Sequence, residues 1–435
     1  MGESDRWLAW VRRARIPILV LAALALLIVF GGSHTAFIVG ILIFVVALLA
    51  SVMLHELGHF LTAKKFGMRV TQFFLGFGTT LWSFFRGETE YGIKALPLGG
   101  FVKITGMTQL EEIDPADEPR SFRRQPGWQR IIVLAAGSFM HFALAFFLLF
   151  ILGIGIGISS QSNTISAITS CVPASVSALN SANPCPSGSK TAIPSPAKDS
   201  GLRSGDKIIS LAGKPVSSFD QLHNVLKAVP AGTAVPIVIE RNGHQLTKTI
   251  TLAQVPKRAV PYLGMEPTTV YQPKGFFSAV GFAGTQFADT ITSSVSAIGQ
   301  LPAAIPDLFA KDRAKTPAGN VSSVVGVANV TGDVTEAAIP WQAKVSLVLF
   351  LIASLNIFVG AFNLLPLLPL DGGHLAVVIF ERIRAWFARL RHRPDPGLVD
   401  IQKLVPVSML VFAVLVGFGT LLIAADIFNP VHLQV

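Results

Sequence analysis

The sequence predicts a multi-pass α-helical membrane protein that also has a membrane-embedded β-hairpin region and a mixed α/β domain outside the cytoplasm. Of its 435 residues, 51% are hydrophobic and only 14% are charged, which is more apolar than one soluble core requires. A helix needs about 20 apolar residues to cross a bilayer. The candidate apolar runs, the first of them short, are residues 16–30, 36–54, 131–158, 345–365 and 405–424.

The net charge is +10, and the basic residues flank these apolar runs. By the positive-inside rule, such basic clusters lie in the cytoplasm. The clusters are Arg12, Arg13 and Arg15; Lys64, Lys65 and Arg69; Arg123, Arg124 and Arg130; and residues 382–393. One long region, residues 159–341, therefore remains outside the cytoplasm. Because the positive charge is explained as a topology signal, no nucleic-acid partner is expected.

The N-terminal segment, residues 1–35, joins a basic start to the first apolar run. It could be a signal peptide, but the small-residue cleavage pattern around Ser33 to Ala36 is poor. We therefore expect an uncleaved extra span. In either case the next segment, residues 36–66, runs from outside to inside.

This segment ends in the motif His55-Glu56-Leu57-Gly58-His59. Four residues make about one helical turn, so both imidazoles face the same way and can bind one metal ion. Two imidazoles and one oxygen ligand suit zinc, and Glu56 beside its water would be the general base. Ionisable groups in a span are costly and persist mainly where they have a partner or a task. A helix cap or snorkelling would explain only one of the three.

The third zinc ligand is expected from another inward-running span, because only such a span ends in the same layer. Residues 342–380 contain one, and it finishes in NLLPLLPLDGGH. Pro366 and Pro369 disfavour continued helix, so an extended chain is expected there. Asp371 is predicted as the ligand, although it could instead cap the following helix. His374 is a competing ligand, but a supporting role is expected for it.

Residues 67–130 do not form a simple loop. They contain strand-like apolar runs joined by a turn at Gly87. Open strands cannot face lipid, because their backbone groups would be unpaired. We therefore expect a re-entrant β-hairpin beside the metal site, followed by a cytoplasmic loop. Gly76 and Gly78 would let another backbone approach closely.

Residues 159–255 begin with a Ser/Pro-rich stretch and continue as a globular domain. Strands are expected at 207–211 and on both sides of the turn at Asn242 and Gly243, with a helix at 218–229. The stretch SGLRSGD resembles the AGLxxGD element of PDZ domains in bacterial proteases. This resemblance implies peptide binding by strand addition, and a steric lid is the alternative.

The two cysteines, Cys171 and Cys185, both lie in this region. A disulfide between them would close a loop of about fifteen residues and stabilise the fold by around 3 kcal/mol on the chain-entropy model. Two free thiols remain the alternative, and a zinc site made by two cysteines alone is less expected.

The remaining segments follow from hydropathy and periodicity. Apolar residues recur at helical spacing between Phe276 and Ile298, which predicts one or two amphipathic helices packed against the spans or the bilayer. The remaining division is a span at 131–158, amphipathic helices and a linker at 256–341, a basic cytoplasmic loop at 381–403, and the last span with its tail at 404–435.

The two polar motifs together resemble the site-2 protease family of intramembrane zinc metalloproteases, closest to its actinobacterial, mycobacterial-type branch with a single PDZ domain. The resemblance begins at about residue 36 and implies one zinc ion. The segments LGFG and PLGGF resemble the family's membrane-inserted hairpin. The residues that match the family's motifs are His55, Glu56, His59, Asn363, Pro366, Pro369 and Asp371.

The span after Arg130 departs from the family pattern. It reads AAGSFMHFALAF where many relatives have AGPxxN, so Ser138 and His141 replace proline and asparagine. His141 could bond to the carboxylate of the zinc site or to substrate, or it could be a satisfied polar residue within the bundle. We favour a supporting or substrate-binding role.

The resemblance implies regulated intramembrane proteolysis in a bacterial cell membrane. The substrates would be single-span membrane proteins, in this branch anti-sigma factors already trimmed by another protease, with the PDZ domain excluding untrimmed ones. The active site would lie near the cytoplasmic side and the PDZ domain outside. Two alternatives are a metal-binding transporter, which would line several spans with polar residues, and a non-catalytic PDZ scaffold, which would not need Glu56.

Overall fold

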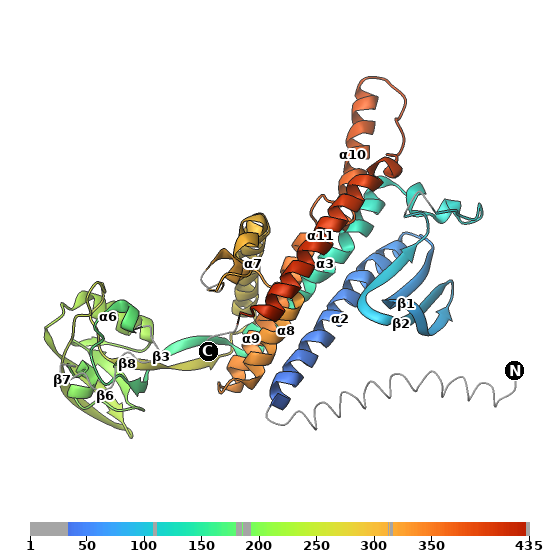
Figure 1. Ribbon diagram of the computed structural model, residues 1–435. Helices are drawn as coiled ribbons and strands as arrows, with labels where there is room; N and C mark the ends of the chain where they lie inside the picture. Colours follow the sequence, from blue (N-terminus) through green and yellow to red (C-terminus); the bar gives the residue numbers. More distant parts are fainter. Residues whose placement is uncertain are drawn as a thin grey trace. The chain divides into compact units, whose positions relative to one another are not determined.

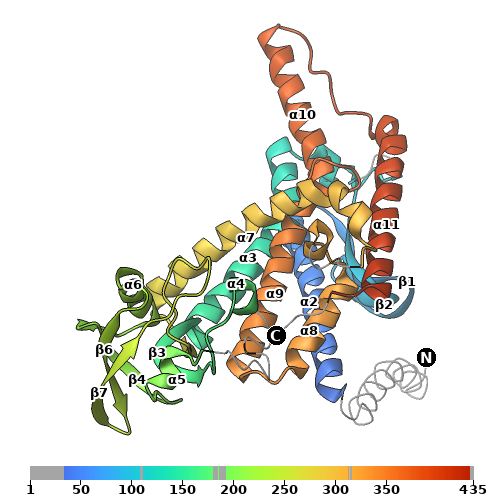
Figure 2. The same cartoon turned by 60° about the vertical axis from the view of Figure 1, so that its left-hand side comes forward.

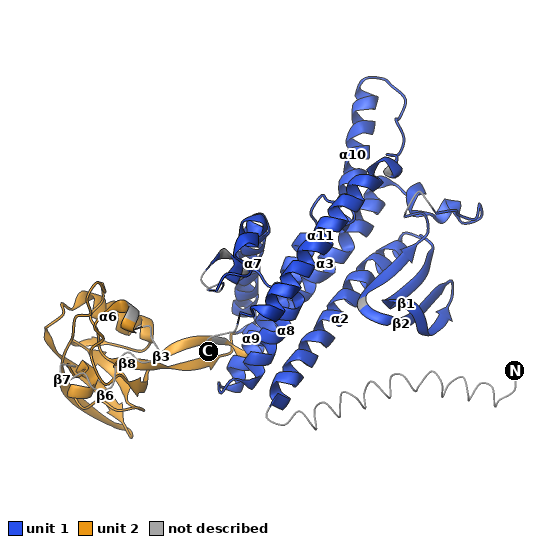
Figure 3. Ribbon diagram, viewed as in Figure 1, with its two compact units in different colours: residues 1–155, 275–435 blue, residues 156–274 orange. Residues whose placement is uncertain are grey.

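The computed structural model describes residues 34–107, 111–179, 185, 193–311, 313 and 316–431. It consists of two compact units, residues 1–155 with 275–435 and residues 156–274, which are described separately (Figure 3). The expected first apolar run, residues 16–30, lies outside the described residues.

Within the described part of the chain, four helices of the first unit are long and apolar enough to cross a membrane (Figure 1). They are α2 (Thr35–Lys65), α3 (Gly127–Ile151), α9 (Trp341–Asn363) and α11 (Val405–Phe428). A π-helical turn, Leu152–Ile156, extends α3. These helices match the four apolar runs after the first, and α2 continues past its apolar run through the HELGH motif.

Helix α3 is the centre of the first unit, because it packs against α2, α9, α7 (Phe276–Ala304) and α10 (Asp371–Leu390) (Figure 2). A buried cluster joins three of these helices through Ala145, Leu149, Ala283, Ala353 and Ile357. Of the predicted amphipathic pattern, Phe287 and Ile291 pack against this cluster, whereas Phe276, Phe277, Val280 and Val295 are exposed. The helix α8 (Val324–Glu336) packs mainly against α2.

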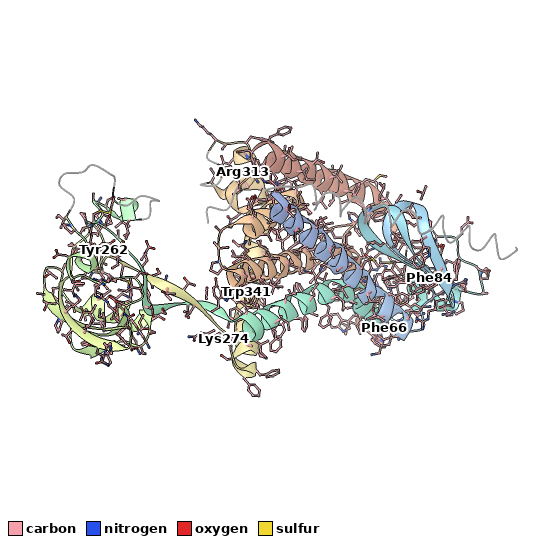
Figure 4. All side chains as sticks on the ribbon, turned by 90° about the horizontal axis from the view of Figure 1, so that it is seen from below. Phe66, Phe84, Tyr262, Lys274, Arg313 and Trp341 are labelled. Carbon is pink, nitrogen blue, oxygen red and sulfur yellow. A yellow bond between two sulfur atoms is a disulfide. The ribbon has the colours of Figure 1, made fainter. Side chains whose placement is uncertain are left out.

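The last span, α11, is tied to the segment before α8 by a buried ion pair. Arg313, labelled in Figure 4, donates a 2.8 Å hydrogen bond to Asp426 of α11. The same guanidinium also donates to the carbonyls of Val321 and Asn429. All the charge buried at this point is thus paired and hydrogen-bonded, as burial requires.

The predicted hairpin is present as β1 (Val70–Arg86) and β2 (Thr89–Ile104). The first half of β1 is paired on both sides, because Leu75 lies opposite Gly100 on one side and opposite Ile93 on the other. Figure 4 labels Phe84, which lies in β1, and Phe66, which follows the last residue of α2. The sheet packs against α2.

Two glycines of β1 have positive φ, as the bend of this strand requires. The values are 88° at Gly76 and 86° at Gly78. A Cβ atom on Gly76 would lie 2.6 Å from the carbonyl oxygen of Leu96, so the predicted close approach of a second backbone is present there. At Gly78 the neighbour is instead the Leu96 side chain, 3.8 Å away.

The second unit is built on a six-stranded sheet. Its order is β7-β6-β4-β3-β8, and β5 pairs with β4. The strands are β3 (Ile158–Ile168), β4 (Lys207–Leu211), β5 (Lys214–Pro215), β6 (Ala234–Arg241), β7 (His244–Thr251) and β8 (Met265–Gln272). The helices are α4 (Val176–Leu179), α5 (Pro196–Asp199) and α6 (Phe219–Ala228). The arrangement is a PDZ-like domain with its own buried core.

Several local predictions for this unit match the structure. Strand β4 covers the predicted residues 207–211. Ser218 caps α6 by accepting a hydrogen bond from the backbone N–H of Gln221. Asn242 and Gly243 have φ of 52° and 79°, as a two-residue hairpin turn requires. Cys171 and Cys185 form the predicted disulfide.

The expected domain boundary at residue 255 is wrong. The compact unit continues to Lys274, which Figure 4 labels, because β8 pairs with β3, the first strand of the unit. Residues 256–274 were expected to belong to the linker. Pairing between strands about a hundred residues apart is a tertiary feature that local pattern does not reveal.

Short 3₁₀ helices occupy the connections of the first unit. They are Glu118–Arg120, Phe122–Arg124, Ile305–Asp307, Pro317–Asn320 and Ile401–Leu404.

Candidate metal centre

Three potential metal ligands converge where α2 meets the start of α10. His55 and His59 lie one turn apart on α2 and are 7% and 4% exposed. The Nε2 atoms of the two rings are 3.2 Å apart. Asp371, the first residue of α10, places its Oδ2 atom 3.2 Å from Nε2 of His55 and 3.3 Å from Nε2 of His59. Among the described residues, these three make up the group able to hold a metal ion, and His374 is not part of it.

The orientation of His59 is fixed by a backbone carbonyl. Its Nδ1 lies 2.7 Å from the carbonyl oxygen of Val133 on α3. A carbonyl can only accept, so Nδ1 carries the proton and Nε2 offers its lone pair to the centre of the site. Such a bond from the remote ring nitrogen is the usual support of a metal-binding histidine.

The donor atoms fit a zinc ion. The Oδ2 atom of Asp371 is buried and has no hydrogen-bond partner among the described residues, although it faces both imidazoles. A buried carboxylate oxygen without a partner is costly unless a cation satisfies it. Two imidazole nitrogens and one carboxylate oxygen, with room for a further ligand, are a common donor set for catalytic zinc.

Gly137 of α3 makes the space for this convergence. A Cβ atom at this position would lie 2.4 Å from Nε2 of His59 and 2.5 Å from Cε1 of His55. No side chain could occupy this place without displacing both rings. The sequence interpretation missed this residue, and the available signal was the glycine four positions before His141 in an otherwise apolar span.

Asp371 is held in place by the turn that precedes it. The residue is not the N-cap of α10, because Leu370 occupies that position and no side-chain capping bond is present. A Cβ atom on Gly372 would lie 2.3 Å from the Leu365 carbonyl oxygen, and one on Gly373 would lie 2.5 Å from the Leu368 nitrogen. The two glycines therefore allow the turn to fold against the start of the helix.

The expected extended conformation of this turn is wrong. Asn363 is the last residue of α9. After it, the N–H of Leu367 donates to Leu365, and the N–H of Leu370 donates to Leu367. Pro366 and Pro369 end the helix as expected, but these local hydrogen bonds curl the chain into turns.

Glu56 lies between the ligand pair and the hairpin. It is half-buried and follows His55 directly on α2. A Cβ atom on Gly100 of β2 would lie 3.3 Å from Cγ of Glu56 and 3.0 Å from the sulfur of Met53. The backbone of β2 therefore passes directly alongside the glutamate. Gly76 and Gly78 shape the same hairpin but do not contact these residues among the neighbours described for them.

A buried polar network adjoins the ligands on the side of α3 and α9. Nδ1 of His141 lies 2.9 Å from Oδ1 of Asn356 and 3.1 Å from Oγ of Ser51, and Ser51 donates to the same Oδ1. The amide of Asn356 is oriented because its Nδ2 donates to the Ile352 carbonyl. Nδ1 of His141 therefore carries a proton, which leaves its Nε2 as an acceptor. The rings of His141 and His55 are 4.9 Å apart.

Ion pairs hold the hairpin turn to the end of α2. Glu88 lies 2.5 Å from Nζ of Lys64 and accepts two 2.8 Å hydrogen bonds from Arg120. The Arg120 guanidinium, against the opposing effect of burial, lowers the pKa of Glu88 to about 2, and Lys64 acts in the same direction. The hairpin is therefore fixed, through charge, to the helix that carries both histidines.

The site combines two buried imidazoles and a carboxylate with a neighbouring glutamate. On a chain with several membrane-spanning helices, this combination defines a membrane-bound zinc metalloprotease. The chain matches Peptidase family M50 over residues 43–393. It therefore belongs to this family, the site-2 proteases.

Two mycobacterial relatives cover almost the whole chain. Zinc metalloprotease Rip1 of Mycobacterium tuberculosis is 35% identical over 414 residues, which is 91% of this chain and 99% of the relative. Zinc metalloprotease Rip1 of Mycolicibacterium smegmatis is 33% identical over 423 residues, with 91% and 98% covered. Among solved structures, the PDZ domain of the SdrC-like protein Lmo2051 from Listeria monocytogenes is 23% identical and covers 17% of this chain and 77% of that chain, with a TM-score of 0.16.

Proposed function

We propose that this zinc metalloprotease hydrolyses peptide bonds within the transmembrane segments of single-span membrane proteins. The observation that carries the proposal is the convergence of His55, His59 and Asp371 at atoms 3.2 to 3.3 Å apart. The histidines lie on the span α2, and Asp371 begins α10, eight residues after the span α9 ends. In this proposal His55, His59 and Asp371 bind one zinc ion, and Glu56 is the general base.

A zinc ion in this site supplies Lewis-acid polarisation of the scissile carbonyl and makes water acidic enough to be deprotonated near neutral pH. Glu56 accepts the proton from the attacking water and passes it to the leaving amine. Val133 holds His59 in the required tautomer. His141, with Nε2 as an acceptor, can receive a hydrogen bond from water or from a substrate N–H.

The hairpin is the proposed substrate platform. The segment of β2 around Gly100 pairs with β1 through one edge, and the Cβ direction of Gly100 points towards Glu56. A strand edge offers unpaired backbone groups to an extended peptide. Pairing there would hold an unwound substrate segment beside the general base. Asn363, at the end of α9, would hydrogen-bond the substrate backbone.

The proposed substrates are anti-sigma factors that another protease has already trimmed, and the PDZ-like unit would exclude untrimmed proteins. Basic residues at the inner ends of the spans support a cytoplasmic active site and an extracytoplasmic PDZ-like unit. The similarity to mycobacterial zinc metalloproteases supports a bacterial membrane location, and the choice of anti-sigma factors rests on the family resemblance alone.

The test compares the purified chain with E56Q on candidate single-span substrates in proteoliposomes. We expect E56Q to lose cleavage while it retains one zinc per chain, because glutamine cannot accept the proton. The matched control, E112Q, changes an exposed glutamate of the cytoplasmic loop and should cleave normally. Cleavage by E56Q at the wild-type rate would contradict the assignment of Glu56.

A further inference from the structure

The second half of α10 exposes an apolar stripe bordered by arginines. We propose that this segment, residues 379–393, binds the anionic phospholipid headgroups of the membrane that the protein spans. The binding is independent of catalysis. Its consequence for activity rests on the proposed function, because α10 begins at Asp371.

The stripe lies on one face of the helix. Its members are 41% to 58% exposed, although all are large and apolar. They are Ile379, Phe380, Ile383, Trp386, Phe387 and Leu390. Steps of three and four residues place them on one side of a helix. An exposed apolar stripe of this kind, combined with basic residues, is typical of helices at a lipid interface.

The opposite face of α10 packs on the protein. Val378, Glu381 and Ala385 are buried there. Glu381 accepts a 2.9 Å hydrogen bond from Arg130 of α3 and another from the N–H of Val399. Because this face is occupied, the apolar stripe points away from the bundle and is available to lipid.

Arginines border the stripe on both sides. Arg382 and Arg389 are seven residues apart and lie along one border, and Arg384 and Arg391 lie along the other. Arg393 follows in the loop and is also exposed. Of these, Arg384 also donates to the carbonyl of Gly397. Clusters of this size next to a span attract anionic headgroups.

The acidic residues nearby do not cancel this charge. Within residues 379–393 the one carboxylate is Glu381, which is buried in its pair with Arg130. Asp395 and Asp400 lie beyond the segment, and each accepts a hydrogen bond from a backbone N–H of its own loop, at Gly397 and Gln402. Five arginines therefore face an anionic surface without an exposed acid among them.

The start of α3 indicates the depth of this segment in the membrane. A Cβ atom on Gly127 would lie 2.6 Å from Cδ of Arg382, so this arginine sits against the first residue of the span. The neighbouring Trp128 is 51% exposed, and tryptophan is enriched at the membrane–water interface. Helix α10 therefore leaves the hydrocarbon near Arg382, and its second half enters the headgroup layer.

This location connects lipid composition with the metal centre. Helix α10 is continuous from Asp371 to Leu390, so headgroups that fix its second half also restrain the helix that presents the proposed ligand. The expected effect is faster cleavage in membranes that contain anionic lipid.

The test uses the full chain in nanodiscs that contain brominated phosphatidylglycerol or brominated phosphatidylcholine at equal mole fraction. The readout is the fluorescence of Trp386, obtained as the difference between the wild-type protein and W386F in the same nanodiscs. We expect stronger quenching by the anionic lipid. The variant R389Q/R391Q/R393Q should lose roughly 100-fold of the relative affinity for anionic lipid, as three headgroup contacts predict. The matched control, K207Q/K214Q/K227Q, removes three exposed lysines of the second unit and should keep the preference.

Equal quenching by the two lipids, or an unchanged preference in the arginine variant, would overturn the proposal. So would protection of Trp386 from both lipids in nanodiscs that hold two copies of the chain, because the stripe would then be a contact between copies. Zinc content and cleavage are measured on the same samples. If the lipid proposal fails, zinc content and cleavage will be the same in the two lipids. If the proposed function fails, only cleavage will be affected.

Discussion

At the scale of single residues, the proposed metal centre depends on groups that are not themselves proposed ligands. The carbonyl of Val133 sets the proton of His59, and Gly137 leaves room for both imidazole rings. Both belong to α3, which contributes none of the three proposed ligands. The geometry of the ligands is therefore a property of α2, α10 and α3 together.

Replacing Gly137 by alanine should remove zinc. The added methyl group would lie 2.4 Å from Nε2 of His59, closer than non-bonded atoms can approach, so the rings must separate. We expect metal analysis to find much less than one zinc per chain and no cleavage. G155A is the matched control, since a Cβ atom there meets nothing within 4 Å. Full zinc content in G137A would show that the rings can rearrange.

Asn356 is expected to position His141. In N356A, Nδ1 of His141 loses its 2.9 Å partner and the ring is no longer held in one tautomer. Loss of a supporting hydrogen bond near a metal site typically costs about 10- to 100-fold in activity or metal affinity. We expect a fall in kcat of this size with zinc retained. N356D keeps an acceptor for His141 and should recover part of the rate, and equal rates in all three proteins would exclude the role.

At the scale of elements, the hairpin is anchored by charge as well as by packing. Glu88 joins the β1–β2 turn to α2 and to Arg120. The folded-state pKa of Glu88, about 2, lies below its ordinary value of 4.5. A lowered acid pKa stabilises the folded state above the ordinary value, and the contribution is lost as the pH falls from 4.5 towards 2.

E88Q should therefore remove one pH-dependent part of stability. We expect wild-type protein in detergent to lose thermal stability between pH 5 and about 2. E88Q should be less stable than wild type at pH 7 and should show a smaller loss over this range. The measurement is the unfolding midpoint at a series of pH values, with the exposed E112Q as control. Parallel curves for wild type and E88Q would show that the pair contributes nothing.

The elements could largely be predicted from the sequence, because hydropathy and turn chemistry are local. The apolar runs gave the four described spans, Gly87 marked the hairpin turn, and Asn242-Gly243 marked the hairpin of the second unit. Asp371 follows the other span that is predicted to run inward, and the structure brings it to His55 and His59.

What could not be predicted depends on contacts between distant segments. The only local signal for Gly137 is its place four positions before His141, and this signal does not reveal that the rings of another helix occupy the space beside it. Ser51 and Asn356 are similar cases, since each is a polar residue in an apolar run whose role depends on contact with His141 of another helix. The boundary predicted at residue 255 was also wrong because of a distant contact, the pairing of β8 with β3.

At the scale of the whole molecule, the chain combines a helical unit that holds the metal centre with a separately folded PDZ-like unit. The spans expose apolar side chains to lipid and bury their polar groups in pairs. Arg313 with Asp426 and Arg130 with Glu381 are examples at opposite ends of the chain's spans. Among the described residues, two of the buried side-chain atoms without a hydrogen-bond partner, Nδ1 of His55 and Oδ2 of Asp371, belong to the proposed ligands.

The most direct test of this account is zinc stoichiometry and X-ray absorption on the full chain, with H55A, H59A and D371A measured beside E56Q. We predict one zinc per chain in wild type and E56Q, with two imidazole nitrogens at about 2.0 to 2.1 Å and a carboxylate oxygen. Each of the three ligand variants should lose the metal or the corresponding scatterer. If D371A retained one zinc with an unchanged absorption spectrum, Asp371 would not be a ligand and the proposed centre would be wrong.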